Sequence, residues 1–401
     1  MSASKPRLLV LTSTYPRWQG DATPGFVHEL ARRLTDCFEI VVLCPHARGA
    51  ARCEIMDGVT VCRYRYAPDK WESLATGGII NNLKRAPVKW ALVPLFLLAQ
   101  TWATWRLIRC WRPNVIHAHW LIPQGLVVSI LSILSGNTPP FLVTSHGADL
   151  HALRFWPMPE IKKFVARRAA TVTVVSSSMT EVMKAQGIST KAVHVEPMGV
   201  DLEHRFTPDE TVPRTRNEIL FVGRLVEKKG LRYLIGAMPT ILEEHPDAQL
   251  TVAGFGPEER TLRQQAEALD VGERIRFLGA VPQYKLPALY RRAAVFVAPF
   301  IEAAGGDQEG LGLVTVEAIG CGCPVVVSDL PAIRDVIENP DLLVAPSDCQ
   351  QLATKVIHVL ALSDEDKRSF GHELRTNLVE RFDWRWRAND YLELLTRVLA
   401  R

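Results

Sequence analysis

Two glutamates eight residues apart are the first candidates for chemistry. Glu309 and Glu317 enclose the run E-G-L-G-L-V-T-V-E. Gly310 and Gly312 allow the backbone to approach a ligand closely. If a helix begins near Gly312, its free N–H groups and its dipole attract an anion there. Glu317 then lies in the helix among apolar neighbours, where a carboxylate needs a partner or a ligand. Two ordinary surface carboxylates are the alternative interpretation.

Two cations mark a second place where an anion fits. Arg224 follows the predicted strand that begins at Glu218, and Lys229 precedes a helix predicted from Leu231. A cation at a helix N-terminus opposes the helix dipole. The arrangement is reasonable if a diphosphate binds Arg224, Lys229 and the free N–H groups together. Ordinary surface charges remain the alternative.

Three histidines lie in or directly after predicted strands. His117 and His119 share one face of the strand expected over 114–120. They lack a third ligand nearby, which favours core or cleft histidines over a metal site. His146 follows the strand 141–144 in the run S-H-G-A-D. That position before a helix suits substrate contact, and a structural role is equally open.

The elements that position these residues alternate between strands and helices along the whole chain, which predicts parallel sheets wrapped by helices. The 401 residues, 47% hydrophobic and 22% charged, are enough for two or three domains with sizeable cores. Ligands of such sheets bind at the carboxyl ends of strands, so the loop 13–25 with Arg17 and Trp18 is expected to face a cleft. The domains expected are 1–205 with a tail helix of about 384–401, a linker at 206–217, and 218–383.

Composition and motifs exclude several classes of function. A net charge of +4 is too mild to indicate a nucleic-acid partner. The G-x-G at 254–256 lacks the third glycine of a dinucleotide fingerprint, because Glu259 occupies that place. It therefore predicts a tight turn and disfavours a nicotinamide oxidoreductase. The eight cysteines contain no C-x-x-C pair, which indicates reduced, mostly buried thiols in a cytoplasmic protein.

The segment 84–112 is rich in Trp, Arg and aliphatic residues. Its length approaches the ~20 apolar residues of a membrane span, but Pro94, Gln100 and two threonines interrupt it. The chain on either side belongs to one α/β pattern, which a span would divide. A buried domain helix and an interfacial helix at a bilayer surface are the two favoured interpretations. Both can hold along different parts of the segment.

Four motifs of the second half and two of the first resemble the retaining glycosyltransferases of family 4, which have the GT-B fold. They are V-G-R-L-V-E-K-K-G-L (222–231), V-A-G-F-G-P-E (252–258), F-L-G-A-V (277–281), E-G-L-G-L-V-T-V-E-A (309–318), V-I-H-A-H-W-L-I-P-Q-G (115–125) and T-S-H-G-A-D-L (144–150). The resemblance covers nearly the whole chain. It implies two Rossmann-like domains facing across a cleft, with the C-terminal helix crossing back to the N-terminal domain.

The resemblance also implies roles for single residues. Arg224 and Lys229 would bind the donor diphosphate, and Glu317 the ribose hydroxyls. Glu309 would contact the transferred sugar, and His146 would lie near the reaction centre, so that closure of the two domains is part of the expected mechanism.

Further donor contacts are implied around the start of the helix. The backbone N–H groups of Gly310, Leu311, Gly312 and Leu313 would cradle sugar and phosphate. Gly25 would close over the phosphates, although this chain has Gly25-Phe26 where many relatives have two glycines. Arg17, Trp18 and His119 are expected on the acceptor side.

The function expected is retaining sugar transfer from a nucleotide-sugar to an acceptor hydroxyl, without metal or other cofactor. The acceptor expected is a lipid-linked or cell-surface glycan precursor, met by a cytoplasmic enzyme at the inner face of a membrane through 84–112. A nucleotide-sugar epimerase of the same fold and a catalytically silent nucleotide-sugar-binding scaffold are the alternatives. Acceptor-dependent release of nucleoside diphosphate distinguishes transfer from both.

Overall fold

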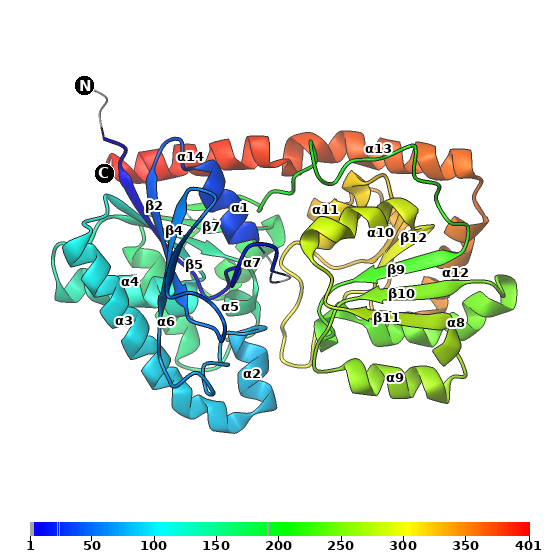
Figure 1. The fold of residues 1–401 in the computed structure, drawn as a ribbon, viewed down its shortest axis with the longest axis horizontal. Coiled ribbons are helices and arrows are strands. Elements are labelled where there is room, and N and C mark those ends of the chain that lie inside the picture. The colour runs from blue at the N-terminus through cyan, green and yellow to red at the C-terminus, as the bar shows by residue number, and fades with distance from the viewer. Residues whose placement is uncertain (1–3, 22, 24, 191) are drawn as a thin grey trace. The chain divides into compact units, whose positions relative to one another are not determined.

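The computed structural model describes residues 4–21, 23, 25–190 and 192–401. The chain divides into two compact units, Met1–Met198 with Arg387–Arg401 and Gly199–Trp386. Each unit is a sheet flanked by helices (Figure 1). The predicted α/β class is therefore confirmed.

The first unit contains an eight-stranded sheet in the order β3-β4-β2-β1-β5-β6-β7-β8. Its neighbouring strands run parallel except β3 and β4, which form an antiparallel hairpin. Asp57 and Gly58 turn this hairpin with positive φ angles of 47° and 80°, as the Asp-Gly pair predicts. The strands are β1 (Arg7–Leu11), β2 (Glu39–Pro45), β3 (Cys53–Met56), β4 (Val59–Tyr64), β5 (Val115–His119), β6 (Phe141–Ser145), β7 (Thr171–Val174) and β8 (Val193–Val195).

Helices connect these strands in the right order for a parallel sheet. They are α1 (Phe26–Arg33), α2 (Ile79–Arg85), α3 (Leu92–Cys110), α4 (Leu126–Leu134), α5 (Ala148–His151), α6 (Met158–Arg168) and α7 (Ser177–Ala185). The short turns η1 (Pro87–Ala91) and η2 (Leu121–Gly125) precede α3 and α4.

The second unit contains a six-stranded parallel sheet in the order β11-β10-β9-β12-β13-β14. Its strands are β9 (Glu218–Val222), β10 (Gln249–Ala253), β11 (Ile275–Gly279), β12 (Val295–Ala298), β13 (Val325–Ser328) and β14 (Leu343–Val344). Its helices are α8 (Leu231–Glu244), α9 (Glu259–Ala268), α10 (Leu286–Arg292), α11 (Leu313–Gly320), α12 (Cys349–Ala361) and α13 (Asp364–Phe382). The short turns are η3 (Glu227–Lys229), η4 (Gly272–Arg274), η5 (Gln283–Lys285), η6 (Ile333–Asp335) and η7 (Pro340–Leu342).

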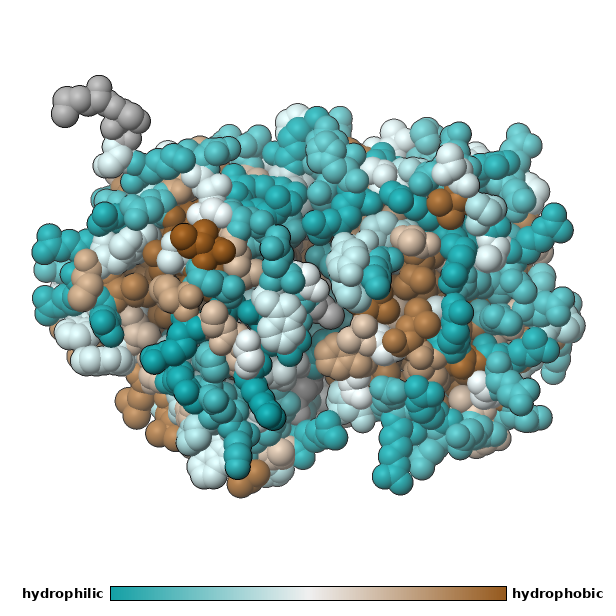
Figure 2. Space-filling model, in the orientation of Figure 1, coloured by the Kyte–Doolittle hydropathy of each residue, from teal (hydrophilic) through white to brown (hydrophobic). Residues whose placement is uncertain are grey.

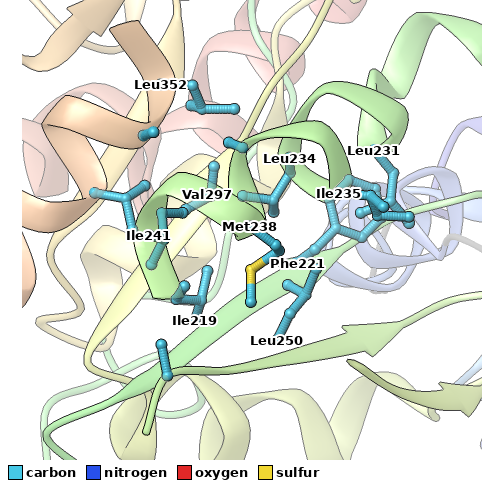
Figure 3. Close-up of a cluster of buried hydrophobic side chains, with 14 of the residues drawn as sticks. Ile219, Phe221, Leu231, Leu234, Ile235, Met238, Ile241, Leu250, Val297 and Leu352 are labelled. Atoms are coloured by element: carbon cyan, nitrogen blue, oxygen red, sulfur yellow. The ribbon is translucent and has the colours of Figure 1, made fainter. Parts of the chain in front are cut away.

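The core of the second unit fixes the ends of the strands that carry its candidate site. Leu234 and Met238 of α8 pack among strand residues such as Phe221 and Val297 (Figure 3). All four side chains are almost fully buried. Burying each of them is worth about 1.5–3 kcal/mol, so β9 and β12 are rigid supports for the loops that follow them.

The boundary between the units falls at Met198, earlier than the expected linker 206–217. The linker residues belong to the second unit and are packed against it. Phe206 is fully buried, and the Arg214 guanidinium donates to the backbone oxygens of Ala293 and Gly322 at 2.6 and 3.0 Å. The segment 206–217 is therefore polar because side chains such as Arg214 bind backbone carbonyls of the second unit.

The last helix, α14 (Trp384–Leu399), begins in the second unit and continues in the first from Arg387. Tyr391 is buried there and donates its hydroxyl to the backbone oxygen of Glu196 at 2.8 Å. The crossing of the C-terminal helix back to the first domain is therefore confirmed.

The cysteines are all free thiols. The expectation that they are mostly buried is wrong, because three of the eight are buried, two are half-buried, and Cys37, Cys53 and Cys110 are exposed. Each of these three cysteines has a charged neighbour in the sequence, at Asp36, Arg52 and Arg109.

Candidate functional site

The segment that carries Arg224 is held by the glycine turn after β10. Gly223 N–H donates to Ala253 O, and Leu225 N–H donates to Phe255 O, both at 3.0 Å. A Cβ atom on Gly254 would lie 1.8 Å from the carbonyl oxygen of Gly223. The G-x-G is therefore the tight turn that was predicted, and it lets two backbones meet beside Arg224.

Lys229 ends the short turn η3, and α8 begins at Leu231, where the sequence predicted a helix to start. Gly230 separates it from α8 with a φ of +65°. A Cβ atom on Gly230 would lie 1.7 Å from the carbonyl oxygen of Pro299. This close approach docks η3 against the end of β12, where Lys229 Nζ lies 4.6 Å from the centre of the Phe300 ring.

Lys229 and Glu309 form an ion pair with 2.8 Å between Nζ and Oε2. Burial raises the pKa of Glu309, but Lys229, Lys228 and Arg224 outweigh it and lower this pKa to about 2. Burial also lowers the pKa of Arg224, against the opposing effect of Asp307 and Glu309. The structure thus brings three of the predicted residues into one charged cluster.

Lys228 and Asp307 support this cluster and were not among the predicted site residues. Lys228 Nζ lies 3.1 Å from both Asp307 Oδ1 and the carbonyl oxygen of Gln308. Glu227 accepts a hydrogen bond from the backbone of Ala304 at 3.0 Å. These contacts tie the loop 301–309 to η3. The adjacent lysines in the sequence were the available signal, but only the second was assigned a role.

The helix α11 begins where the glycines predicted it. Gly312 precedes Leu313 with a φ of +81°, and its Cβ position lies 2.8 Å from Ile333 Cδ1. Only glycine fits there without strain. Gly310 and Leu311 are buried next to it, while Leu313 is half-buried. The first N–H groups of a helix have no acceptor within the helix, so this end of α11 suits an anion.

Glu317 is buried in the body of α11 beside two partners that the sequence analysis missed. Tyr290 donates its hydroxyl to Glu317 Oε2 at 3.0 Å, and Gln283 Nε2 donates to Oε1 at 3.4 Å. Burial raises the pKa of Glu317 to about 7, although Tyr290, Gln283 and Lys229 lower it. The hydrogen bonds from neutral partners leave a carboxyl group that changes charge near neutral pH.

The first unit brings the three histidines together. His119 Nδ1 lies 2.9 Å from His146 Nε2, and His117 Nε2 lies 2.7 Å from Thr144 Oγ1. Tyr391 of α14 stacks on the ring of His117 with 5.6 Å between centres. Burial lowers the pKa of His117 and of His146 to about 3, so both rings are neutral at pH 7. His119 was predicted on the acceptor side, and the structure makes it a direct partner of His146.

The loop 13–25 places its predicted residues in different settings. Gly25 is buried and accepts from Glu29 N–H at 2.8 Å at the start of α1. Arg17 donates to both carboxylate oxygens of Asp21 at 2.9 and 2.6 Å, and it stacks 4.3 Å from the Trp18 ring centre. Arg17 is thus already paired, and Trp18 is the exposed member. Ala22 and Pro24 of this loop lie outside the described residues.

One group among the described residues has the spacing of metal ligands, and it lies in the first unit. The ligand atoms of His46, Asp69 and Glu72 all fall within 4.8 Å of one another. Arg65 forms ion pairs with both carboxylates. His46 Nδ1 meets Glu72 Oε2 at 2.5 Å. The guanidinium supplies the positive charge that this group needs, and the contacts form a structural ion-pair network.

Comparison with known proteins matches both halves of the chain. The family model described as Glycosyltransferase Family 4 matches residues 26–204, and the model described as Glycosyl transferases group 1 matches residues 204–377. A glycogen synthase of Mycobacterium tuberculosis is 30% identical over 69% of this chain and 67% of its own. A phosphatidyl-myo-inositol mannosyltransferase of Mycolicibacterium smegmatis is 30% identical over 70% of this chain and 72% of its own.

A solved structure extends the similarity to the whole fold. The sucrose-phosphate synthase of Thermosynechococcus elongatus has a TM-score of 0.79 and 21% sequence identity. It covers 99% of this chain and 100% of its own. At this identity the match concerns the fold alone.

Proposed function

This chain belongs to the family 4 (group 1) glycosyltransferases of the GT-B fold, and from that premise we propose that it transfers a sugar from a nucleotide-sugar to an acceptor hydroxyl, with retention and without metal. The observation that carries the donor assignment is the cluster of Arg224, Lys229 and Glu309 in one unit with the start of α11. Cations, helix N–H groups and a sugar-binding carboxylate are what a nucleoside diphosphate sugar needs.

The leaving group is the nucleoside diphosphate, and its developing charge is what the site must stabilise. Arg224, Lys229 and the N–H groups of Gly310–Leu313 supply fixed positive charge for this purpose. A divalent cation would serve the same end in other transferases. Metal-independent transfer is therefore part of the proposal.

The two carboxylates, Glu317 and Glu309, bind different parts of the donor. Glu317 accepts hydrogen bonds from the ribose hydroxyls, and Glu309 contacts the transferred sugar. His146 acts at the sugar as a neutral ring, because its pKa is depressed by burial to about 3. Retention follows if the acceptor oxygen bonds to the anomeric carbon on the face from which the phosphate leaves. The departing phosphate oxygen then takes the acceptor proton, and no protein nucleophile is needed.

The acceptor proposed is a lipid-linked or cell-surface glycan precursor, reached by a cytoplasmic enzyme at the inner face of a membrane. The mannosyltransferase relative, which its name assigns to phosphatidyl-myo-inositol, supports a lipid acceptor. The apolar segment 84–112 supports a membrane contact by its composition.

The test is a panel of nucleotide-sugars screened for binding, followed by turnover with the donor that binds. We expect acceptor-dependent release of nucleoside diphosphate that persists in excess EDTA, and a product with the donor's anomeric configuration by NMR. Sugar interconversion without an acceptor would instead make the protein an epimerase. Binding without turnover under any acceptor would make it a scaffold.

A further inference from the structure

Helix α3 has two fully buried polar residues on its inward side and large exposed apolar residues on its outer side. The inward stripe contains Gln100 and Thr104, which are 1% and 0% exposed. On the outer face, Leu98 and Trp102 are 68% and 63% exposed. A helix on the surface of a water-soluble domain normally turns its apolar stripe toward the core and its polar residues toward water.

The buried side-chain oxygens of Gln100 and Thr104 are not compensated by hydrogen bonds within the described part of the chain. Neither Gln100 Oε1 nor Thr104 Oγ1 has a hydrogen-bond partner among the residues that the structure describes. Phe96 and Ile108 complete the inward stripe at four-residue spacing. In water, burying polar groups without hydrogen-bond partners costs free energy, and so does exposing large apolar side chains to solvent. The outer face therefore needs an apolar cover.

The neighbouring helix α4 extends the exposed apolar area. It packs against α3, and its Ile133 and Leu134 are 58% and 75% exposed. Figure 2 shows hydrophobic side chains along the lower left edge of the molecule, where Figure 1 draws α3. We call the six residues Leu95, Leu98, Trp102, Ile130, Ile133 and Leu134 the apolar face.

Charge complementarity identifies what covers this face. No Asp or Glu occurs in the sequence between Glu72 and Asp149. The same stretch contains five exposed cations around α3, at Lys84, Arg85, Arg106, Arg109 and Arg112. An apolar face flanked by exposed cations matches an anionic lipid bilayer, in which apolar side chains reach the acyl boundary and cations meet headgroups.

The topology limits how deep α3 can lie. By length and composition alone, the helical stretch Pro87–Cys110 could span a membrane. In the fold, 22% of its most apolar 18 residues are buried. The strands on either side of it, β4 and β5, belong to one sheet. Phe96 and Ile108 hold the inward stripe against the domain. A helix fixed in this way lies along a membrane and does not cross it.

We propose that the apolar face of α3 and α4 docks this protein on the surface of an anionic bilayer, with the surrounding cations on the lipid headgroups. This inference deepens the membrane contact of the proposed function and rests on it. Vesicle binding is measured without donor or acceptor, so its failure is distinguishable from a failure of sugar transfer. The sequence favoured a buried domain helix and an interfacial helix, each for a different part of the segment. In this proposal the inward stripe is the buried part, and the apolar face is the interfacial part.

Vesicle co-sedimentation tests the proposal with the full chain. We expect binding to phosphatidylcholine vesicles containing phosphatidylglycerol at low salt, and weaker binding as salt rises. Leu98→Glu with Trp102→Glu should weaken partitioning at least tenfold, since both remove apolar insertion. Replacing Arg106 or Arg109 by Ala should weaken it about fivefold each, which corresponds to about 1 kcal/mol per cation.

The matched control is Ile55→Glu, because Ile55 is 75% exposed on β3 of the same unit. It should bind vesicles as the wild type does. Failure of the wild type to bind at low salt, or equal loss in the Ile55 variant, would overturn the proposal. So would a lipid-free dimer that Trp102→Glu dissociates, since a second copy would then cover the face. Protein that resists alkaline carbonate and needs detergent for extraction would contradict surface docking in favour of a span.

Discussion

Lys229 Nζ lies 2.8 Å from Glu309 Oε2, and this contact is one reason why Glu309 and Glu317 differ in pKa. Burial raises the pKa of both carboxyl groups. Around Glu309, Lys229, Lys228 and Arg224 reverse the effect and lower the pKa to about 2. Around Glu317, neutral Tyr290 and Gln283 do not, and the pKa stays at about 7. The Glu309 carboxylate therefore stays charged around neutral pH, whereas Glu317, with a pKa of about 7, changes charge there.

The adjacent lysines should differ in function. Lys229→Ala should weaken donor binding by about 10- to 100-fold, since a hydrogen bond to a charged group is worth about 1.5–3 kcal/mol. Lys228→Ala should instead lower the melting temperature, because Lys228 ties η3 to Asp307 and Gln308. Calorimetric titration with the donor and thermal melts distinguish the two effects. Equal loss of affinity in both variants, measured on folded protein, would count against a specific role for Lys229.

Donor affinity should rise with pH around neutrality. Ribose hydroxyls donate to a carboxylate, and Glu317 with a pKa of about 7 is mostly protonated at pH 6. We expect the donor to bind about tenfold more tightly at pH 8 than at pH 6. Glu317→Gln should bind weakly and show no such dependence. A pH profile that survives this substitution would place the titrating group elsewhere.

The same carboxyl group should affect folding stability in the opposite direction. Its folded pKa is raised from 4.5 to about 7, so the folded protein holds a proton that the unfolded chain releases. Stability from this group is present below about pH 4.5 and is lost as pH rises towards 7, by at most roughly 3 kcal/mol. Glu317→Gln should therefore be more stable than the wild type at pH 8 in urea melts. A less stable variant would show that Glu317 is satisfied as a carboxylate in the fold.

Gly312 should not tolerate a side chain. Gly312→Ala places a methyl group 2.8 Å from Ile333 Cδ1 on a backbone with a φ of +81°. The left-handed conformation alone costs about 1–2 kcal/mol for a residue with a Cβ. We expect a lower melting temperature and weaker donor binding, because the start of α11 must shift. Gly136→Ala is the control. Gly136 has a similar left-handed φ of +62°, but no atom lies within 4 Å of its Cβ position. Unchanged donor affinity in Gly312→Ala would show that the start of α11 does not bind the donor.

His119 should act as a positioning residue for His146. Its Nδ1 is 2.9 Å from His146 Nε2, and a buried hydrogen bond is worth about 1 kcal/mol. His119→Ala should lower kcat about fivefold and leave the donor KM unchanged. His119→Asn, which keeps a polar atom near the place of Nδ1, should restore most of the rate. Equal losses in both variants would indicate a packing role only.

The charged cluster of the second unit was largely predictable from sequence, because strand ends and helix starts of a parallel sheet meet at one edge. Arg224, Lys229 and Glu309 each follow such an end, and the structure brings them together. Tyr290 was not predictable. Its contact with Glu317 depends on how α10 packs against α11, and no pattern in the sequence encodes that packing.

The first unit shows the same limit. His119 and His146 were each recognised at a strand end, but their hydrogen bond depends on the register of β5 and β6, in which His119 pairs with Thr144. In α3, Gln100 and Thr104 were interpreted as interruptions of an apolar helix. They are the inward face, and only the packed structure reveals which side of such a helix meets the domain.

The most direct test of the account is acceptor-dependent release of nucleoside diphosphate by Arg224→Ala and Glu309→Gln, measured with the donor found in the binding screen. Both variants should remain folded, as judged by circular dichroism and melting temperature. We expect Arg224→Ala to lose donor binding and transfer together. Glu309→Gln should keep most of the donor affinity and lose at least about a hundredfold in kcat, as for other groups that stabilise a transition state. If both variants retain full transfer, Arg224 and Glu309 do not belong to the donor site.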